Sequence, residues 1–207
     1  MNQRDETRGY NMSALDAYKN KRDFSQTPEP AGDSSSHRRG NRFVIQKHMA
    51  RREHYDFRIE VGDVLVSWAI PKQPVTDPEK KRLAVKTEDH PLEYIHFEGT
   101  IPKGNYGAGT MMVWDYGYYY SADDGSLLSD DDMAHMLQTG KVKLHLQGQK
   151  LKGSFSLVKI SKSEKEEWLF MKNKSEQDID YSARSALTGR TMEEIETDIL
   201  MRSDFKS

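Results

Sequence analysis

The chain contains no cysteine, and it has no long run of apolar residues. Across its 207 residues, the lack of cysteine excludes disulfides, a thiolate nucleophile and zinc–thiolate sites. No stretch approaches the ~18 consecutive apolar residues that a membrane-spanning helix needs. The first residues contain no apolar run that resembles a signal peptide. We therefore expect a cytoplasmic protein that does not contact a membrane.

A large excess of charge of either sign is also missing. The 31 Lys and Arg residues face 33 Asp and Glu residues, and the formal net charge is −2. This balance excludes a histone-like polycation but leaves room for a local basic groove. Residues 141–174 carry 9 basic and 3 acidic side chains, whereas residues 175–207 carry 4 and 8. We interpret both segments as solvated faces, and the alternative for the first is a basic strand pair beside a nucleic-acid groove.

Short strand-like runs dominate the middle of the chain. They comprise residues 42–48, 54–60, 64–70, 82–88, 96–98, 110–116, 141–146, 154–160 and 168–172. Gly62 and Asp63, between the second and third runs, suit a tight hairpin. Within this region only residues 130–139 have a helical pattern. Many short strands without alternating long helices predict a mainly β fold, a small closed or partly closed β-barrel with N-terminal and C-terminal helical arms.

The two arms are predicted from helix signals. Ser13 with Asp16 resembles a capping box, and the helix that it starts should end before the prolines of residues 27–30. A flexible linker is expected at residues 32–36. In the tail, Thr191 and Glu194 repeat the capping-box pattern. The expected divisions are an N-terminal helical arm and linker at 1–40, a β-barrel domain at 41–174 and an acidic C-terminal helical tail at 175–207.

The densest polar pattern lies between Gln46 and Arg58. Strand side chains alternate, so His54, Asp56 and Arg58 point to one face, and His48 on the preceding strand can turn toward the same face. Two imidazoles and a carboxylate suit a divalent metal of the Mn²⁺, Fe²⁺ or Zn²⁺ type. Arg58 adds a permanent cation suited to bidentate phosphate contact. The alternative is an exposed strand face with ion pairs, although such a set is costly to build for stability alone.

A second polar pattern follows, in which Arg82, Glu88 and His90 share one strand parity. Alone, His90 reads as a structural histidine and Lys72 as a solvated turn lysine. The glycine-rich residues 99–109 lack the spacing and the ending of a P-loop. We interpret them as a tight backbone crossing between strands.

These motifs resemble a known family. QKHMARREHYDFRIE, SWAIPK, KRLAVKTEDHPLEY, FEGTIPKGNYGAGT and VWDYG are similar to the 3′-phosphoesterase module of bacterial DNA ligase D, and YKNKRDFSQTPEPAG matches the arm that precedes it. The resemblance covers roughly residues 14–175. It implies a β-barrel that holds one Mn²⁺, with Co²⁺ or another divalent metal as alternatives. It also implies an enzyme that removes a terminal ribonucleotide to leave a 3′-phosphate and then hydrolyses that phosphate to a 3′-hydroxyl.

The resemblance also implies roles for individual residues. The expected metal ligands are His48, His54 and Asp56. The expected catalytic residues are His90, Arg58, Lys72, Arg82, Tyr94, Glu88 and Asp89. The substrate phosphate is expected to contact Gln46, Arg58, Lys72, Arg82 and His90. The expected accessory residues for the phosphodiesterase step are Arg22, Asp23 and Glu29. A histidine with a pKa near ~6.5 serves as general acid or base at neutral pH, so we expect His90 to donate a proton to the leaving oxygen.

The expected partners are nucleic acid 3′ ends. The chain has no K-x-D-G adenylation motif, so a separate DNA ligase and an end-bridging repair protein are expected to complete the repair. The family usually has an apolar residue where Glu53 stands, and we expect Glu53 to face solvent.

Two other functions compete with this one. A non-haem Fe(II)-dependent oxygenase is one, because His54-x-Asp56 with a third histidine imitates a facial triad. A non-catalytic nucleic-acid-binding β-barrel is the other. Such a module needs stacking aromatics beside a basic groove. The residues that could supply them are Tyr116, Tyr118, Tyr119 and Tyr120, although packing in the barrel is the use we favour. An inert binder has little reason to keep the histidines and Asp56 together.

Overall fold

The computed structural model describes residues 15–32, 40–74, 77–161, 166–173 and 182–203. The strands are β1 (Arg42–Met49), β2 (Glu53–Val61), β3 (Val64–Ile70), β4 (Lys81–Lys86), β5 (His90–Pro91), β6 (Gly99–Ile101), β7 (Gly109–Ser121), β8 (Lys141–Gly148), β9 (Lys152–Lys159) and β10 (Glu167–Lys172). The helices are the 3₁₀ turn η1 (Leu92–His96), α2 (Asp130–Thr139) and α3 (Met192–Ser203), and residues 15–19 are also helical. None of these helices is both long enough and apolar enough to cross a membrane.

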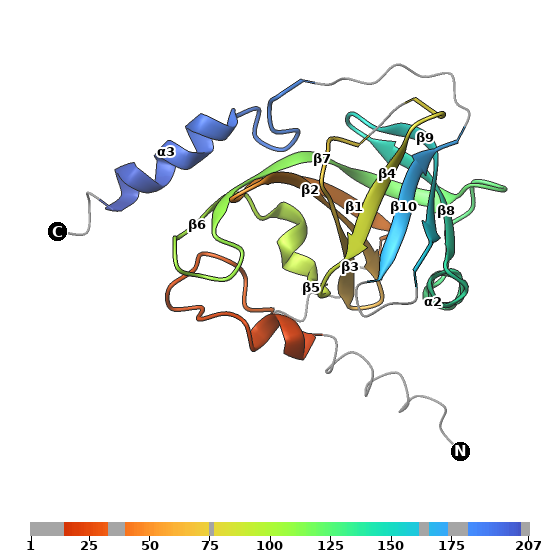
Figure 1. The fold of residues 1–207 in the computed structure, drawn as a ribbon, viewed down its shortest axis with the longest axis horizontal. Coiled ribbons are helices and arrows are strands. Elements are labelled where there is room, and N and C mark those ends of the chain that lie inside the picture. Colours follow the sequence, from red (N-terminus) through yellow and green to blue (C-terminus); the bar gives the residue numbers. More distant parts are fainter. Residues whose placement is uncertain (1–14, 33–39, 75–76, 162–165, 174–181, 204–207) are drawn as a thin grey trace.

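Eight antiparallel strands close into a barrel. Their order is β1-β2-β3-β4-β10-β9-β8-β7, and β7 pairs with β1 again (Figure 1). The short strands β6 and β5 pair with β7 and β3 outside this ring. Full closure leaves no free edge in the ring that could pair with another chain. The predicted mainly β, closed-barrel fold is confirmed.

Aromatic and branched side chains fill the barrel. Trp68 and Trp168 meet edge to face with their ring centroids 5.7 Å apart, and Phe57 lies 5.2 Å from Phe170. On β8 every second residue is buried, which is the pattern expected of a strand with one face inside the barrel. Tyr119 is also buried, whereas Tyr118 is half exposed, so packing accounts for only part of the tyrosine run.

A second apolar layer covers part of the outer face of the barrel. Tyr18 of the N-terminal arm and Tyr94 of η1 pack on Val44, Leu65 and Val113, and all five side chains are buried. Figure 1 shows the arm and η1 on the same side of the barrel as β5. The outer faces of β1 and β2 are therefore partly shielded from water, which is unusual for the outside of a small barrel.

Two local predictions are confirmed. Val61 pairs with Val64 across a two-residue turn, in which Gly62 adopts a φ of +59° that favours glycine. At the start of α3, the backbone N–H of Thr191 donates to Glu194 Oε2, and the backbone N–H of Glu194 donates to Thr191 Oγ1. The corresponding residue of the first arm, Ser13, lies outside the described residues, as does most of the predicted linker.

The strand predicted at residues 96–98 is wrong. Leu92, Tyr94 and Ile95 are buried together in η1, and the next strand begins at Gly99. The spacing of these apolar residues fits a 3₁₀ turn because residues three apart lie on one side of such a turn. The strand predicted to reach Glu88 ends at Lys86, while β7 extends beyond the predicted end at Tyr116. The glycine-rich segment does connect two strands, β6 and β7.

Candidate active site

The β1–β2 hairpin brings the first polar pattern together. His48 pairs with His54, and Gln46 pairs with Asp56, so alternate residues of both strands share the outer face of the barrel. Asp56, Gln46 and His48 are buried because the arm and η1 cover this face. The His54 side chain is 24% exposed, so the cluster opens to solvent beside it.

Three metal-ligating side chains converge here. His54 Nε2 lies 3.5 Å from Asp56 Oδ1, and His48 Nδ1 lies 3.8 Å from Asp56 Oδ2. One ligating atom from each of the three residues lies within 4.8 Å of the other two. Ligands at ~2.0–2.1 Å from a common ion are themselves about 3–3.5 Å apart, so a small contraction would complete the site. This group could hold a divalent ion.

Both histidines can present a ring nitrogen to a cation. His54 Nδ1 lies 3.0 Å from the carbonyl oxygen of Arg52 and can donate to it, which leaves the lone pair of Nε2 directed toward Asp56. Burial lowers the pKa of His48, although Asp56 partly opposes this effect. His48 Nε2 is buried without a hydrogen-bond partner among the described residues. Imidazole nitrogens beside a carboxylate form a donor set that suits a divalent transition metal.

Arg58 lies beside this cluster and is held on three sides. Its Nε donates to Gln46 Oε1 at 2.8 Å, and its Nη2 donates to Asp56 Oδ2 at 3.1 Å. Its Nη1 lies 3.1 Å from His90 Nδ1. Gln46 in turn donates from Nε2 to the carbonyl oxygens of Tyr94 and Phe97, so every polar group of the amide has a partner. The guanidinium plane is thus fixed by both a barrel strand and η1.

His90 is buried between this arginine and the arm. Burial, then Arg58 and Arg22, hold the pKa of His90 well below its usual value, so the imidazole is neutral at pH 7. Its Nδ1 lies 2.9 Å from the carbonyl oxygen of Glu88, to which it can donate, as well as 3.1 Å from Arg58 Nη1, from which it can accept. One nitrogen cannot do both at once, so the neutral imidazole makes the two contacts in different tautomers.

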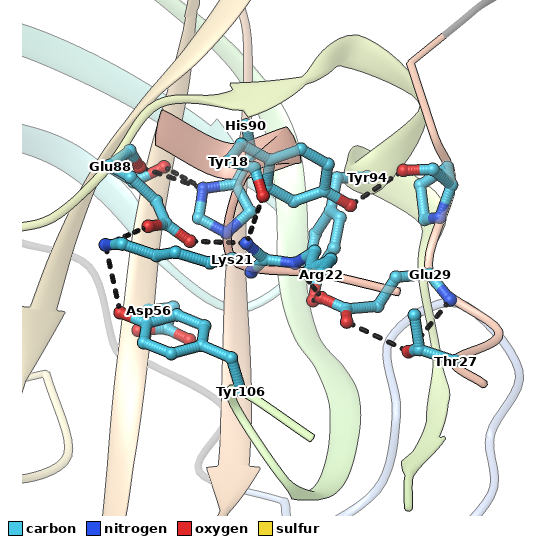
Figure 2. A network of polar contacts seen from close by, with 12 residues as sticks. Tyr18, Lys21, Arg22, Thr27, Glu29, Asp56, Glu88, His90, Tyr94 and Tyr106 are labelled. Atoms are coloured by element: carbon cyan, nitrogen blue, oxygen red, sulfur yellow. Dashed lines mark hydrogen bonds and ion pairs between the residues drawn. The ribbon is translucent and has the colours of Figure 1, made fainter. Parts of the chain in front are cut away.

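The N-terminal arm completes the surroundings of His90. Figure 2 shows Arg22 and Lys21 converging on Glu88, at 2.6 Å and 2.5 Å between nitrogen and oxygen. Arg22 Nε also donates to Glu29 Oε1, which accepts a 2.8 Å hydrogen bond from the Tyr94 hydroxyl. Two carboxylates face two cations, so the charge of this buried cluster is balanced.

Comparison with known proteins identifies this arrangement. Residues 46–159 match the model of the DNA ligase D 3′-phosphoesterase domain. The chain belongs to this 3′-phosphoesterase family. The multifunctional non-homologous end joining protein LigD of Pseudomonas aeruginosa is 44% identical over 166 residues, covering 77% of this chain and 18% of that protein. The multifunctional non-homologous end joining DNA repair protein LigD of Mycobacterium tuberculosis is 43% identical over 171 residues, covering 79% of this chain and 20% of that protein.

The chain therefore spans about a fifth of the length of these relatives. Membership in the 3′-phosphoesterase family supports hydrolysis of phosphoester bonds and a role in processing ends during DNA repair.

The structure does not bring every expected residue of the 3′-phosphoesterase site into contact. Lys72 is exposed just after β3, and Arg82 donates from Nε to the carbonyl oxygen of Gln73. Among the described residues, neither forms a hydrogen bond or ion pair with the His48 cluster. Asp89 pairs with Lys86 at 2.7 Å. On the arm, Asp23 is exposed, and among the described residues its carboxylate accepts hydrogen bonds from Ser25 only.

Sequence reasoning missed several residues of this site. Tyr18 is fully buried, lies 5.1 Å from the His90 ring and stacks against the Arg22 guanidinium. Lys21 and Thr27 join the carboxylates of the arm network, and Tyr106 lies beside Lys21. The available signal for Tyr18 was its spacing of three residues from Leu15, which places two apolar side chains on one side of the arm helix.

Proposed function

We propose that this chain is a metal-dependent 3′-phosphoesterase that removes 3′-terminal ribonucleotides and 3′-phosphates from DNA or RNA ends. The product is a 3′-hydroxyl that a ligase can join. The observation that carries the proposal is the contact of Arg58 with both Asp56 of the metal-ligating group and His90. A metal site, a phosphate-binding cation and a proton carrier within direct contact are what phosphoester hydrolysis needs.

His48, His54 and Asp56 would hold the metal, with Mn²⁺ as our first choice and Co²⁺ or another divalent ion as alternatives. When bound, such an ion supplies a Lewis acid that withdraws charge from a phosphoryl oxygen. Arg58 would bind a second oxygen of the same phosphate. Of its five N–H groups, three have partners among the described residues and two are left for a ligand. Gln46 would position Arg58, because its own amide has no capacity left for the substrate.

His90 would carry the proton for the leaving oxygen. Burial and the nearby Arg58 and Arg22 keep the imidazole neutral, and a bound phosphate dianion would offset the charge of Arg58. The imidazolium would then donate from Nδ1 to the Glu88 carbonyl oxygen and hold the transferable proton at Nε2. Lys72 and Arg82 would add phosphate contacts at the rim, and Asp89 would position Lys86 through their ion pair.

The arm would support the phosphodiesterase step. Arg22 and Glu29 link the arm to Glu88 and Tyr94, which flank His90 in the sequence and the fold. Undocking of the arm would remove the shielding of His90 and Arg58. We assign Asp23 a weaker accessory role because it lies outside the buried network. A separate DNA ligase and an end-bridging protein in the cytoplasm would complete the repair.

The test uses a 5′-labelled DNA strand that ends either in one ribonucleotide or in a 3′-phosphate. Each strand is incubated with Mn²⁺, with EDTA, and with the variants His48→Ala and His90→Ala. We expect Mn²⁺-dependent shortening or dephosphorylation that both variants lose. The matched control is His145→Ala, because His145 is exposed on β8. Salt-sensitive binding without turnover would favour the non-catalytic barrel instead, and an equal loss of activity in His145→Ala would remove the assignment of the site.

A further inference from the structure

The hairpin loop between β6 and β7 is held rigidly beside the metal-ligating group. The backbone N–H of Asn105 donates to the carbonyl oxygen of Pro102, and the backbone N–H of Ala108 donates to the carbonyl oxygen of Asn105. At Gly109, a Cβ atom would lie 2.4 Å from the carbonyl oxygen of Met49, so the loop is pressed against the end of β1. Met49 directly follows His48 in β1, so this contact lies next to the candidate metal group. Residues 102–108 thus border the site at a fixed position.

This loop presents one aromatic ring to solvent. Tyr106 is 51% exposed, and it belongs to the loop that meets the end of β1 beside His48. Lys21 Nζ lies 4.8 Å from the centre of the Tyr106 ring and Arg22 Cζ lies 5.3 Å from it. Figure 2 shows the ring at the edge of the polar network, with Lys21 above it. The protein thus places an exposed aromatic ring and an exposed ammonium group together at the rim of a phosphate site.

This combination matches one chemical group. A nucleotide has a phosphate joined to a flat base, and single-stranded nucleic acid binds to proteins through cations that meet phosphates and aromatic rings that stack on bases. An inorganic phosphate or a phosphorylated side chain would leave the ring unused. Stacking of one base on one aromatic side chain changes affinity about 5- to 150-fold.

We propose that Tyr106 is the stacking platform for the nucleobase next to the scissile phosphate. This inference rests on the proposed function, because it places the reacting phosphate at Arg58 and the metal group. The contact is sequence-tolerant, since every base has a stacking face. The enzyme would therefore accept any base at the strand end but would discriminate against an abasic end.

The test compares two strands that end in a 3′-phosphate and differ only in the last nucleotide, which is normal in one and abasic in the other. Affinity is measured by fluorescence anisotropy in EDTA, so that no turnover occurs. The wild type is expected to bind the normal strand about 5- to 150-fold more tightly. Tyr106→Ala is expected to lose this preference and Tyr106→Phe to keep it. Tyr118→Ala is the matched control, because Tyr118 is 52% exposed and pairs with Arg42 at the far end of β1.

The outcomes separate this inference from the proposed function. A preference that survives in Tyr106→Ala, or that is absent from the wild type, would overturn the stacking role. Loss of the preference for the normal strand in Tyr118→Ala instead would place the base at the other end of β1 and would also overturn the stacking role of Tyr106. Turnover of the normal strand by the wild type with Mn²⁺ is scored separately and reports on the phosphoesterase function alone. Unchanged melting temperatures of the variants show that each one is folded.

Discussion

Glu29 is the carboxylate on which docking of the N-terminal arm depends most directly. Its side chain is fully buried and accepts three hydrogen bonds, from Arg22 Nε at 2.9 Å, Thr27 Oγ1 at 2.9 Å and the Tyr94 hydroxyl at 2.8 Å. The substitution Glu29→Gln keeps the size but removes the charge. It also places an NH₂ group opposite Thr27 Oγ1, which donates to Glu29 in the wild type and would have to reverse its hydroxyl to accept, so this buried pair is poorly matched. We therefore expect the arm to dock more weakly.

The magnitude follows from these contacts. Loss of one charge-assisted hydrogen bond and mismatch of a second buried pair cost about 2–4 kcal/mol together. Arg22 keeps its ion pair with Glu88, so the cost stays below that of a fully unpaired buried charge. The network joins the arm to the barrel, so this free energy is lost from arm docking while the barrel keeps its own contacts. At ~1.36 kcal/mol per factor of ten, the open arm becomes about 30- to 1,000-fold more populated.

Native-state hydrogen exchange measures this change directly. The reporters on the arm are the N–H groups of Asn20 and Gln26, which donate to Asp16 and Asp23, and the reporter on the barrel is the N–H of Tyr119. We expect faster exchange at the first two and no change at the third. Asp23→Asn is the matched control, because that exposed carboxylate contacts only Ser25. Unchanged protection of the arm in Glu29→Gln, or equal loss in the barrel, would falsify the docking role.

Three further predictions concern the site and the barrel. At a Mn²⁺ concentration of ~100 times its Kd, thermal unfolding should show the wild type stabilised by about 2.7 kcal/mol. His54→Ala should lose most of this stabilisation, and an equal stabilisation of the variant would contradict the ligand assignment. Arg58→Lys should lower kcat/KM at least ~100-fold and leave the Mn²⁺ stabilisation intact, because an ammonium cannot replace the planar fork. Burial raises the pKa of Asp115 to about 6. The contribution of this group to stability is thus complete below about pH 4 and lost as the pH rises through 6. The free energy of unfolding in urea of the wild type, relative to that of Asp115→Asn, should fall by about 3 kcal/mol between pH 4 and 7.5. Parallel pH curves for the two proteins would contradict this prediction.

The closed barrel and the ligand group were predictable because both follow from strand alternation. In the β1–β2 hairpin Met49 pairs with Glu53 across the three-residue loop 50–52, and this short loop sets the register in which His48 faces His54. Asp56 then follows two residues on. No long-range information is needed for this group, since strands adjacent in sequence supply it.

The arm network could not be predicted from local patterns. Arg22 and Glu88 are 66 residues apart in the sequence, and Glu29 and Tyr94 are 65 apart. Charge alternation along a segment says which side chains share a face, but it does not say which distant segment will cover that face. The failed strand at residues 96–98 has a related cause. Three residues are too few to separate alternation from a 3₁₀ turn, and burial against Tyr18 decides between them.

Arg58 is a buried cation whose charge has to be balanced within the site. A buried guanidinium is costly unless its charge is matched, and here Asp56 is the only carboxylate among the described residues with which it pairs directly. If Asp56 held a metal ion, an anionic phosphate would supply the further negative charge that balances Arg58. The two carboxylates of the arm network are already matched by Arg22 and Lys21, so they do not compete for this role. We therefore expect bound phosphate to balance the charge of Arg58 when Asp56 also holds a metal ion.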